Sequence, residues 1–125
     1  MDRSTAGAQS LRRGLQLLRL LAEHQEDGIR LSEAMAASGL QRSTCHRLLA
    51  CLVEEQFAER DAGGKVYRLG VDAMQLGFAA MRRVPLVDQC RALMQRLARM
   101  SGDTVFLVIR QGDHCLCLHR EEGPF

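Results

Sequence analysis

The chain has 125 residues, of which 46% are hydrophobic and 26% are charged, and only two are prolines. This composition is ordinary for a globular protein and argues against disorder, and the length suffices for one small core or two minimal ones. The formal net charge of +2 does not by itself indicate a nucleic-acid partner, so any such argument depends on where the basic residues lie.

Membrane and secretory classes are not expected. Every apolar stretch is shorter than the roughly 20 residues that a spanning helix needs, and the start of the chain lacks the apolar segment of a secretory signal. The five cysteines are an odd number scattered through apolar patterns, which favours reduced, buried thiols over a disulfide framework. We therefore expect a cytoplasmic protein without membrane contact.

The N-terminal region predicts an arm followed by a helix. Residues 1–9 are small and polar without periodicity, so we expect them to be flexible. A helix is expected from Ser10, whose hydroxyl would cap the first free N–H groups. Its apolar residues recur at spacings of three and four, and this stripe consists of Leu11, Leu15, Leu18, Leu21 and Ala22, widened by Leu17 and Leu20.

The next segment predicts two helices joined by a tight turn. After a short extended piece at residues 29–31, a second helix is expected to be capped by Ser32 and ended by Gly39. Only residues 39–41 separate it from a third helix, predicted over residues 42–55. Two short helices joined by a turn that contains glycine are typical of a helix-turn-helix.

The third helix divides into two arcs at about 100° per residue. Its apolar arc, which we expect to pack inside, consists of Cys45, Leu48, Leu49, Leu52 and Val53. The opposite arc, which we expect to be presented outward, consists of Ser43, Arg47, Ala50 and Glu54. The neighbours Cys45 and His46 would point about 100° apart, so they do not predict a catalytic thiolate pair, and an enzyme is not expected.

A hairpin follows the third helix. Residues 57–60 and 65–69 are two strand-like runs around Asp61-Ala62-Gly63-Gly64, a composition that suits a hairpin turn. Helix, short strand, helix, helix and hairpin is the order of elements in a winged helix domain, which we assign to residues 10–70. The basic residues near the tip and edges of this wing are Arg60, Lys65 and Arg68.

The remainder predicts a linker helix and the start of a second domain. Residues 71–84 read as an apolar helix with Met74, Phe78 and Met81 on one side. Pro85 fits the first turn of a further helix, whose stripe consists of Leu86, Cys90, Leu93, Met94, Leu97 and Met100 and which ends at Gly102.

Two strands, at residues 104–110 and 114–120, complete the pattern. Residues 85–125 therefore predict the first part of an α+β unit. An antiparallel pair with one helix is marginal alone, so we expect further residues or another chain to complete it. The fold class expected for the whole chain is mainly α with small β.

Three runs of the sequence stand out as a series: QRSTCHRLLACL from Gln41, the preceding SEAMAASGL from Ser32, and the AGGKVYRLG hairpin. Together they resemble the IclR family of bacterial transcription regulators. The resemblance continues through Leu76-Gly77 and Asp103-Thr104 to the final HREEGPF, and so covers residues 10–125.

The resemblance implies a winged helix domain, a linker helix and a GAF/PAS-like effector domain that begins in residues 85–125. It also implies a transcription regulator, either a repressor or an activator, that binds operator DNA as a homodimer or tetramer. The effectors implied are small organic acids or aromatic compounds, and we expect one to bind only if the effector domain is completed. No cofactor is expected.

The polar arc of the third helix is the expected DNA-reading surface, because the major groove is about 12 Å wide and admits one helix. Arg47 suits the two acceptors on a guanine edge, Ser43 suits a phosphate or base edge, and the wing suits phosphates. The candidate DNA contacts are Arg42, Ser43, Thr44, His46, Arg47, Arg60, Lys65, Arg68, Arg12 and Arg13. The hydroxyls could instead satisfy the helix N-terminus, and the wing cations could form a solvated edge.

A metal- or redox-sensing repressor is the alternative function. Cys115, Cys117 and His119 alternate, and would project as three ligands from one face of a strand. The plainer interpretation is that this face packs on the helix that carries Leu93 and Leu97. A third class, a winged helix used only for protein contacts, predicts no salt-dependent affinity for DNA.

Overall fold

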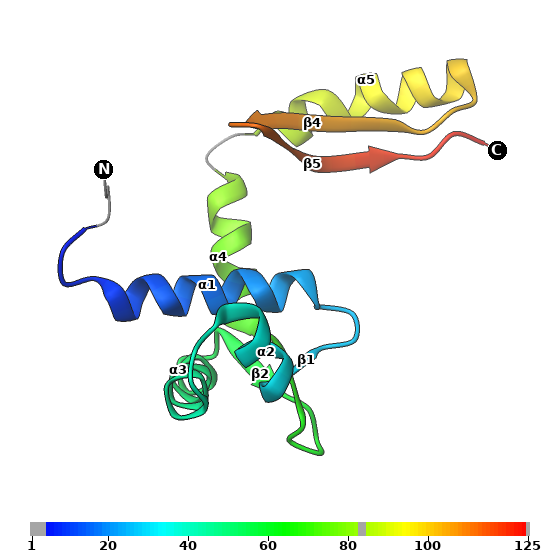
Figure 1. Cartoon of the computed structure of the whole chain (residues 1–125). Helices are drawn as coiled ribbons and strands as arrows, with labels where there is room; N and C mark the ends of the chain where they lie inside the picture. Colours follow the sequence, from blue (N-terminus) through cyan, green and yellow to red (C-terminus); the bar gives the residue numbers. More distant parts are fainter. Residues whose placement is uncertain (1–4, 83–84, 125) are drawn as a thin grey trace. The chain divides into compact units, whose positions relative to one another are not determined.

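The computed structural model describes residues 5–82 and 85–124, which form two compact units (Figure 1). The first unit extends from Met1 to Phe78 and the second from Ala79 to Phe125, so the boundary falls within one helix. In the parts of the chain that the structure describes, no helix is long and apolar enough to cross a membrane.

The first unit has the order of elements expected for a winged helix domain. These elements are α1 (Gln9–Glu23), β1 (Ile29–Arg30), α2 (Leu31–Ser38), α3 (Arg42–Glu54), β2 (Ala58–Arg60), β3 (Val66–Leu69) and the start of α4 (Val71–Arg82). The strands form one antiparallel sheet in the order β1-β3-β2, with Ile29 opposite Tyr67 and Ala58 opposite Leu69. The central place of β3 ties the wing to the strand that precedes α2.

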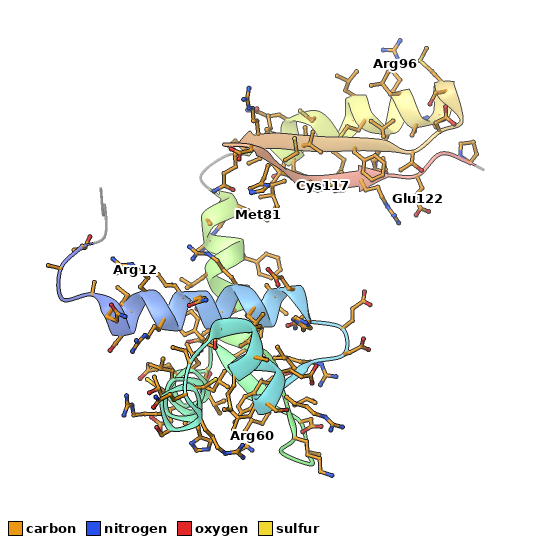
Figure 2. The ribbon with its side chains drawn as sticks, in the orientation of Figure 1. Arg12, Arg60, Met81, Arg96, Cys117 and Glu122 are labelled. Carbon is orange, nitrogen blue, oxygen red and sulfur yellow. The ribbon has the colours of Figure 1, made fainter. Side chains whose placement is uncertain are left out.

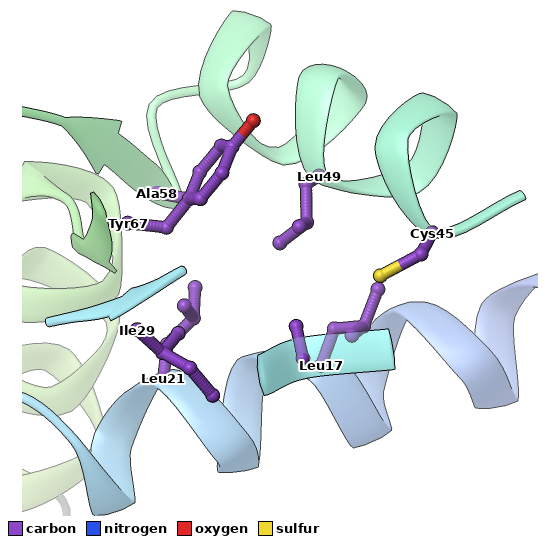
Figure 3. Packing of buried hydrophobic residues seen from close by; sticks show 8 residues of the cluster. Leu17, Leu21, Ile29, Cys45, Leu49, Ala58 and Tyr67 are labelled. Atoms are coloured by element: carbon purple, nitrogen blue, oxygen red, sulfur yellow. The ribbon is translucent and has the colours of Figure 1, made fainter. Parts of the chain in front are cut away.

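One hydrophobic core holds the first unit together (Figure 3). Its buried members come from three helices and three strands, and they are Leu17, Leu21, Ile29, Ala34, Cys45, Leu49, Ala58 and Tyr67. The apolar arc predicted for α3 is confirmed, since two of its members are fully buried and Leu48, Leu52 and Val53 pack against the core. One side of α3 is therefore fixed inside the unit.

The start of α1 differs from the prediction. The helix begins at Gln9 with Ala8 as its N-cap and without a side-chain capping bond, so Ser10 is an internal residue and not the cap. Residues 1–4 of the expected arm lie outside the described residues. Leu11 and Leu15 are 66% and 42% exposed, and Ala22 is exposed as well. The predicted stripe was wrong for these three residues because the core reaches α1 through Leu17 and Leu21.

The cap of α2 also differs from the prediction, whereas its end is confirmed. The helix begins at Leu31, so Ser32 lies inside it, and the carboxylate of Glu33 accepts the N–H of the N-cap residue Arg30 at 3.2 Å. The helix ends at Gly39, which has a φ of +74° and donates to the carbonyl of Met35 at 2.9 Å. A positive φ at this position suits glycine because it lacks a Cβ.

The second unit contains α5 (Leu86–Ser101), β4 (Val105–Gln111) and β5 (His114–Glu121). Pro85 is the N-cap of α5, and Gly102, with a φ of +78°, ends that helix as predicted. The two strands pair in an antiparallel hairpin. Both expected strands are thereby confirmed to within one residue at each end.

The stripe predicted for α5 was half wrong. Met94 and Ala98 are the buried residues of this helix, and Leu86 and Cys90 of the predicted stripe are half-buried. Leu93, Leu97 and Met100 are exposed to 58%, 45% and 74%. Periodicity identified apolar residues on two sides of the helix, whereas only one side has a neighbouring layer in the described residues.

A β-bulge in β5 removes the predicted three-ligand face. Leu107 pairs with His119 and Val108 pairs with Cys117, so Leu118 is an extra residue between them. Because Leu107 and Val108 are consecutive and point to opposite faces, Cys117 and His119 do so as well. Among the described residues no group of three potential ligands could hold a metal ion.

The plainer interpretation of the three alternating residues was also wrong. Cys115 and Cys117 are exposed, as are Leu93 and Leu97, on which they were expected to pack. His119 is half-buried, and its Nε2 lies 2.8 Å from Oε1 of Glu121. The side chain of His119 therefore has a local partner within its own strand.

Candidate nucleic-acid interface

The outward side of α3 is accessible. Ser43, Arg47 and Glu54 are exposed, as are the flanking Arg42 and His46. Thr44 and Ala50 are half-buried. Among the described residues, neither Arg42 nor Arg47 forms an ion pair. Both guanidinium groups are thus available to an external acceptor.

The inward side of α3 holds the helix in place. Cys45 and Leu49 are both 0% exposed, and they lie beside residues of α1 and the sheet (Figure 3). Burial raises the pKa of the Cys45 thiol, and a hydrogen bond with Ser38 lowers it to a smaller extent. The thiol therefore stays protonated and serves as a packing group, as the sequence predicted for this arc.

The N-terminus of α3 has no side-chain cap among the residues that the structure describes. The preceding residue, Gln41, has extended backbone angles, and its side chain makes no capping hydrogen bond. The N–H groups of the first helical turn have no acceptor within the helix, and such donors suit a phosphate. The turn of residues 39–41 has the predicted length. The exposed Ser43 and Arg47 lie in the first two turns of α3, so these backbone donors are close to them.

The tip of the wing is a compact hydrogen-bonded turn. The Oδ1 atom of Asp61 accepts the N–H of Lys65 at 2.8 Å and that of Val66 at 3.3 Å. The carbonyl of Asp61 also accepts the N–H of Gly64 at 2.8 Å. The hydrogen bond from Lys65 is the largest cause that lowers the pKa of Asp61, followed by the one from Val66. This carboxylate therefore remains ionised at neutral pH.

The two arginines of the wing have partners inside the protein. Arg60, labelled in Figure 2, donates to the carbonyl of Gly64, and its Cζ lies 5.1 Å from the centre of the Tyr67 ring. Arg68 donates to the carbonyls of Asp27 at 3.1 Å and Glu26 at 3.4 Å. Each guanidinium has five N–H donors and so retains some for another acceptor.

Lys65 differs from these arginines. It is exposed at the tip, and among the described residues its ammonium group forms no ion pair. Sequence reasoning singled out its charge but missed Asp61, which holds its backbone. The signal was present in the sequence, because an aspartate that opens a turn often bonds to backbone N–H groups further along.

The candidates on α1 lie near its N-terminal end. Arg12, labelled in Figure 2, is exposed and donates to the carbonyl of Thr5 at 3.4 Å. Arg13 is half-buried. Neither residue shares a hydrogen bond or an ion pair with α3 or the wing in the part of the chain that the structure describes.

Comparison with known proteins identifies the domain. Residues 10–62, which include α3 and the first half of the wing, match the IclR helix-turn-helix domain. This chain belongs to the IclR helix-turn-helix family. The matched residues include the outward side of α3, whereas Lys65 and Arg68 of the wing lie beyond the match.

Several relatives of this chain are named as transcriptional regulators. The chain is 35% identical over 118 residues to the HTH-type transcriptional regulator BhcR of Paracoccus denitrificans, covering 94% of this chain and 42% of that protein. It is 31% identical over 112 residues to the transcriptional repressor IclR of Escherichia coli, covering 89% of this chain and 40% of that protein. The chain thus spans less than half the length of either relative.

Solved structures agree with this assignment. An IclR family transcriptional regulator from Brucella abortus has a TM-score of 0.79 and 25% identity, with 99% of this chain and 48% of that chain covered. HmgR of Pseudomonas aeruginosa has a TM-score of 0.73 and 27% identity, with 92% and 49% covered. These likenesses extend over both units of this IclR-type chain.

Proposed function

We propose that this chain binds double-stranded operator DNA as part of a transcriptional regulator, with α3 in the major groove and the wing on the sugar-phosphate backbone. The observation that carries the proposal is the exposed arc of Ser43 and Arg47 on a helix whose opposite side, at Cys45 and Leu49, is fully buried. Such a helix can enter a groove without exposing the core. Binding, and not catalysis, is the proposed activity.

The roles within the interface follow from residue chemistry. Arg47 can donate two hydrogen bonds to a guanine edge, which discriminates between bases, whereas Lys65 can neutralise a phosphate on any sequence. The other proposed contacts, to phosphates or to flanking base edges, are Arg42, Ser43, Thr44, His46, Arg60, Arg68, Arg12 and Arg13.

A homodimer through α4 is the proposed assembly. None of the described side chains of α4 is buried, and Met74, Leu76 and Phe78 are exposed to 62%, 58% and 63%. An apolar helix surface of this kind is typical of an interface between chains. A two-fold axis between the copies would present two α3 helices to an operator with two related half-sites.

The remaining organisation is proposed from the family. Residues 10–70 would bind DNA and residues 71–84 would link, while residues 85–125 would form the first part of an effector-binding domain. This arrangement is consistent with a chain that spans 48% of the Brucella abortus regulator. A small organic effector would bind only where that domain is completed.

The test compares Arg47→Ala with Arg96→Ala. Arg96 is an exposed arginine of α5 in the second unit (Figure 2), so its loss removes the same charge from outside the interface. After selection of bound duplexes from a random pool, Arg47→Ala should weaken binding to the selected sequence by about 1–3 kcal/mol. Its binding to an unrelated duplex should change much less.

Arg96→Ala should leave both affinities close to those of the unsubstituted protein. Equal losses for the two variants, or no salt-dependent affinity for any duplex, would contradict the proposal. The second result would instead favour a winged helix that contacts only proteins.

A further inference from the structure

The backbone of the wing tip is held by one side chain. One oxygen of the Asp61 carboxylate, Oδ1, accepts two backbone hydrogen bonds, from the N–H of Lys65 at 2.8 Å and from that of Val66 at 3.3 Å. The N–H of Asp61 also donates to the carbonyl of Val66 at 3.1 Å. The position of the Lys65 backbone is thus tied to the end of β2.

The same turn is connected to the core through Arg60. Its guanidinium donates to the carbonyl of Gly64 and lies over the ring of Tyr67, which is only 2% exposed. Gly64 has a φ of +67°, and a Cβ there would lie 3.6 Å from the nearest guanidinium nitrogen. The backbone of the tip is therefore held by two side chains, the carboxylate of Asp61 and the guanidinium of Arg60.

Such fixing matters because the turn contains Gly63 and Gly64. Two consecutive glycines give an unrestrained tip many backbone conformations, and ordering them when DNA binds would cost affinity. A tip that is ordered before binding avoids this cost.

We propose that Asp61 is a positioning residue for DNA binding, because its carboxylate holds the backbone from which the Lys65 ammonium reaches a phosphate. This inference rests on the proposed function. Electrostatics alone predicts the opposite effect of Asp61, since a negative charge at the tip repels the phosphates that Lys65 attracts. The sign of the effect therefore separates a positioning role from a mere surface charge.

The experiment measures the affinity of the full chain for a short labelled duplex of mixed sequence, by fluorescence anisotropy over a range of salt concentrations. Asp61→Ala removes the acceptor and the charge, and should weaken binding by roughly threefold to tenfold, the order of one lost phosphate contact. The slope of log affinity against log salt should flatten by about one unit. Asp61→Asn keeps the Oδ1 acceptor and loses only the charge, so it should bind at least as tightly as the unsubstituted protein.

A double variant shows whether the effect passes through Lys65. Asp61→Ala in a Lys65→Ala background should add little further loss, because the contact that it positions is already absent. Thermal unfolding of each variant checks that α3 is still folded. Should Asp61→Ala not fold, Asp61→Asn keeps the inference falsifiable, because weaker binding by that variant contradicts a geometric role.

Three results would overturn the inference. They are Asp61→Ala binding as tightly as the unsubstituted protein or tighter, Asp61→Asn binding more weakly, and Asp61→Ala causing the same loss with and without Lys65. If Lys65→Ala weakens binding in any of these cases, the proposed function stands and only the role of Asp61 fails. Absence of salt-dependent binding by the unsubstituted protein would remove both proposals.

Discussion

The two units of the chain differ in how completely they bury their apolar side chains. In the first unit, eight buried hydrophobic residues come from α1, β1, α2, α3, β2 and β3, so every element of that unit except the start of α4 contributes to one core. In the described part of the second unit, the buried residues are Met94 and Ala98, both from α5. The first unit thus has a core of its own, whereas in the described part of the second unit a single hairpin packs on one side of α5.

In the described part of the second unit, apolar side chains of both the helix and the hairpin are exposed. Leu93 and Leu97 on α5 and Phe106 and Val108 on β4 are exposed to between 45% and 58%. A helix and a hairpin form two layers, but each also has an outer apolar face that needs a further neighbour. The winged helix unit therefore has a hydrophobic core built from several of its elements, whereas the buried residues of the second unit all come from one helix.

The largest expected effect is the loss of stability when a core side chain of the first unit is shortened, compared with the same change in the second unit. Leu49→Ala removes a fully buried side chain from the first core and should reduce the free energy of unfolding of that unit by about 2–5 kcal/mol. Met94→Ala in the second unit should cost less, because its surroundings are already close to solvent. Urea unfolding of each variant, followed by circular dichroism, measures both losses. Equal losses would contradict the conclusion that the first unit buries its apolar side chains more completely than the second.

The second prediction concerns the junction where the wing meets α4. A Cβ at Gly70 would lie 2.5 Å from the carbonyl oxygen of Gln56 and 3.0 Å from that of Ala58, and neither backbone atom can easily move away. Gly70→Ala should therefore destabilise the first unit by about 1–3 kcal/mol. Thermal unfolding measures the shift.

Gly77→Ala is the matched control. Gly77 lies within α4, and a Cβ there would meet nothing within 4 Å. Alanine favours a helix interior over glycine by roughly 0.8–1.0 kcal/mol, so this variant should be neutral or slightly more stable. A stabilising effect of Gly70→Ala would show that the close approach at that junction is absent in solution.

The smallest expected effect lies in the second unit and depends on pH. The hydrogen bond with His119 is the main cause that lowers the pKa of Glu121 from its ordinary value of 4.5, and Gln95 and Arg91 of α5 add to it. A lowered pKa in the folded state stabilises the protein above the ordinary value, and this stabilisation is lost as the pH falls through the lowered value.

Glu121→Gln should therefore reduce the melting temperature of the second unit slightly at neutral pH. The difference between variant and unsubstituted protein should shrink when melting is repeated as the pH falls through the lowered pKa of Glu121, where the carboxyl group becomes protonated. A difference that stays constant with pH would show that the charge of Glu121 does not contribute.

Local chemistry predicted the elements of the winged helix unit well. The turn at residues 39–41, the end of α2 at Gly39 and the division of α3 into two arcs all follow from glycine geometry and helical periodicity. The wing was predicted to within one residue at each end, from its strand-like runs and its turn composition. The contacts proposed for Arg47 and Lys65 remain predictions, because exposure makes a DNA contact possible without demonstrating it.

Other features depend on contacts between distant segments. The sheet order β1-β3-β2 and the hydrogen bonds from Arg68 to residues 26 and 27 join segments about 40 residues apart, and no local pattern contains them. The bulge at Leu118 reverses the face of His119 relative to Cys117. A strict alternation of residues in the sequence therefore misassigned that face.

The sequence by itself determined where the helices, the turn and the wing lie, because these depend on capping, periodicity and backbone freedom within a few residues. Only the tertiary structure decided which apolar residues are covered. Leu17 is buried whereas Leu11 is 66% exposed, although both belong to the same helix. Burial requires a neighbouring layer, and the position of that layer is a property of the whole chain.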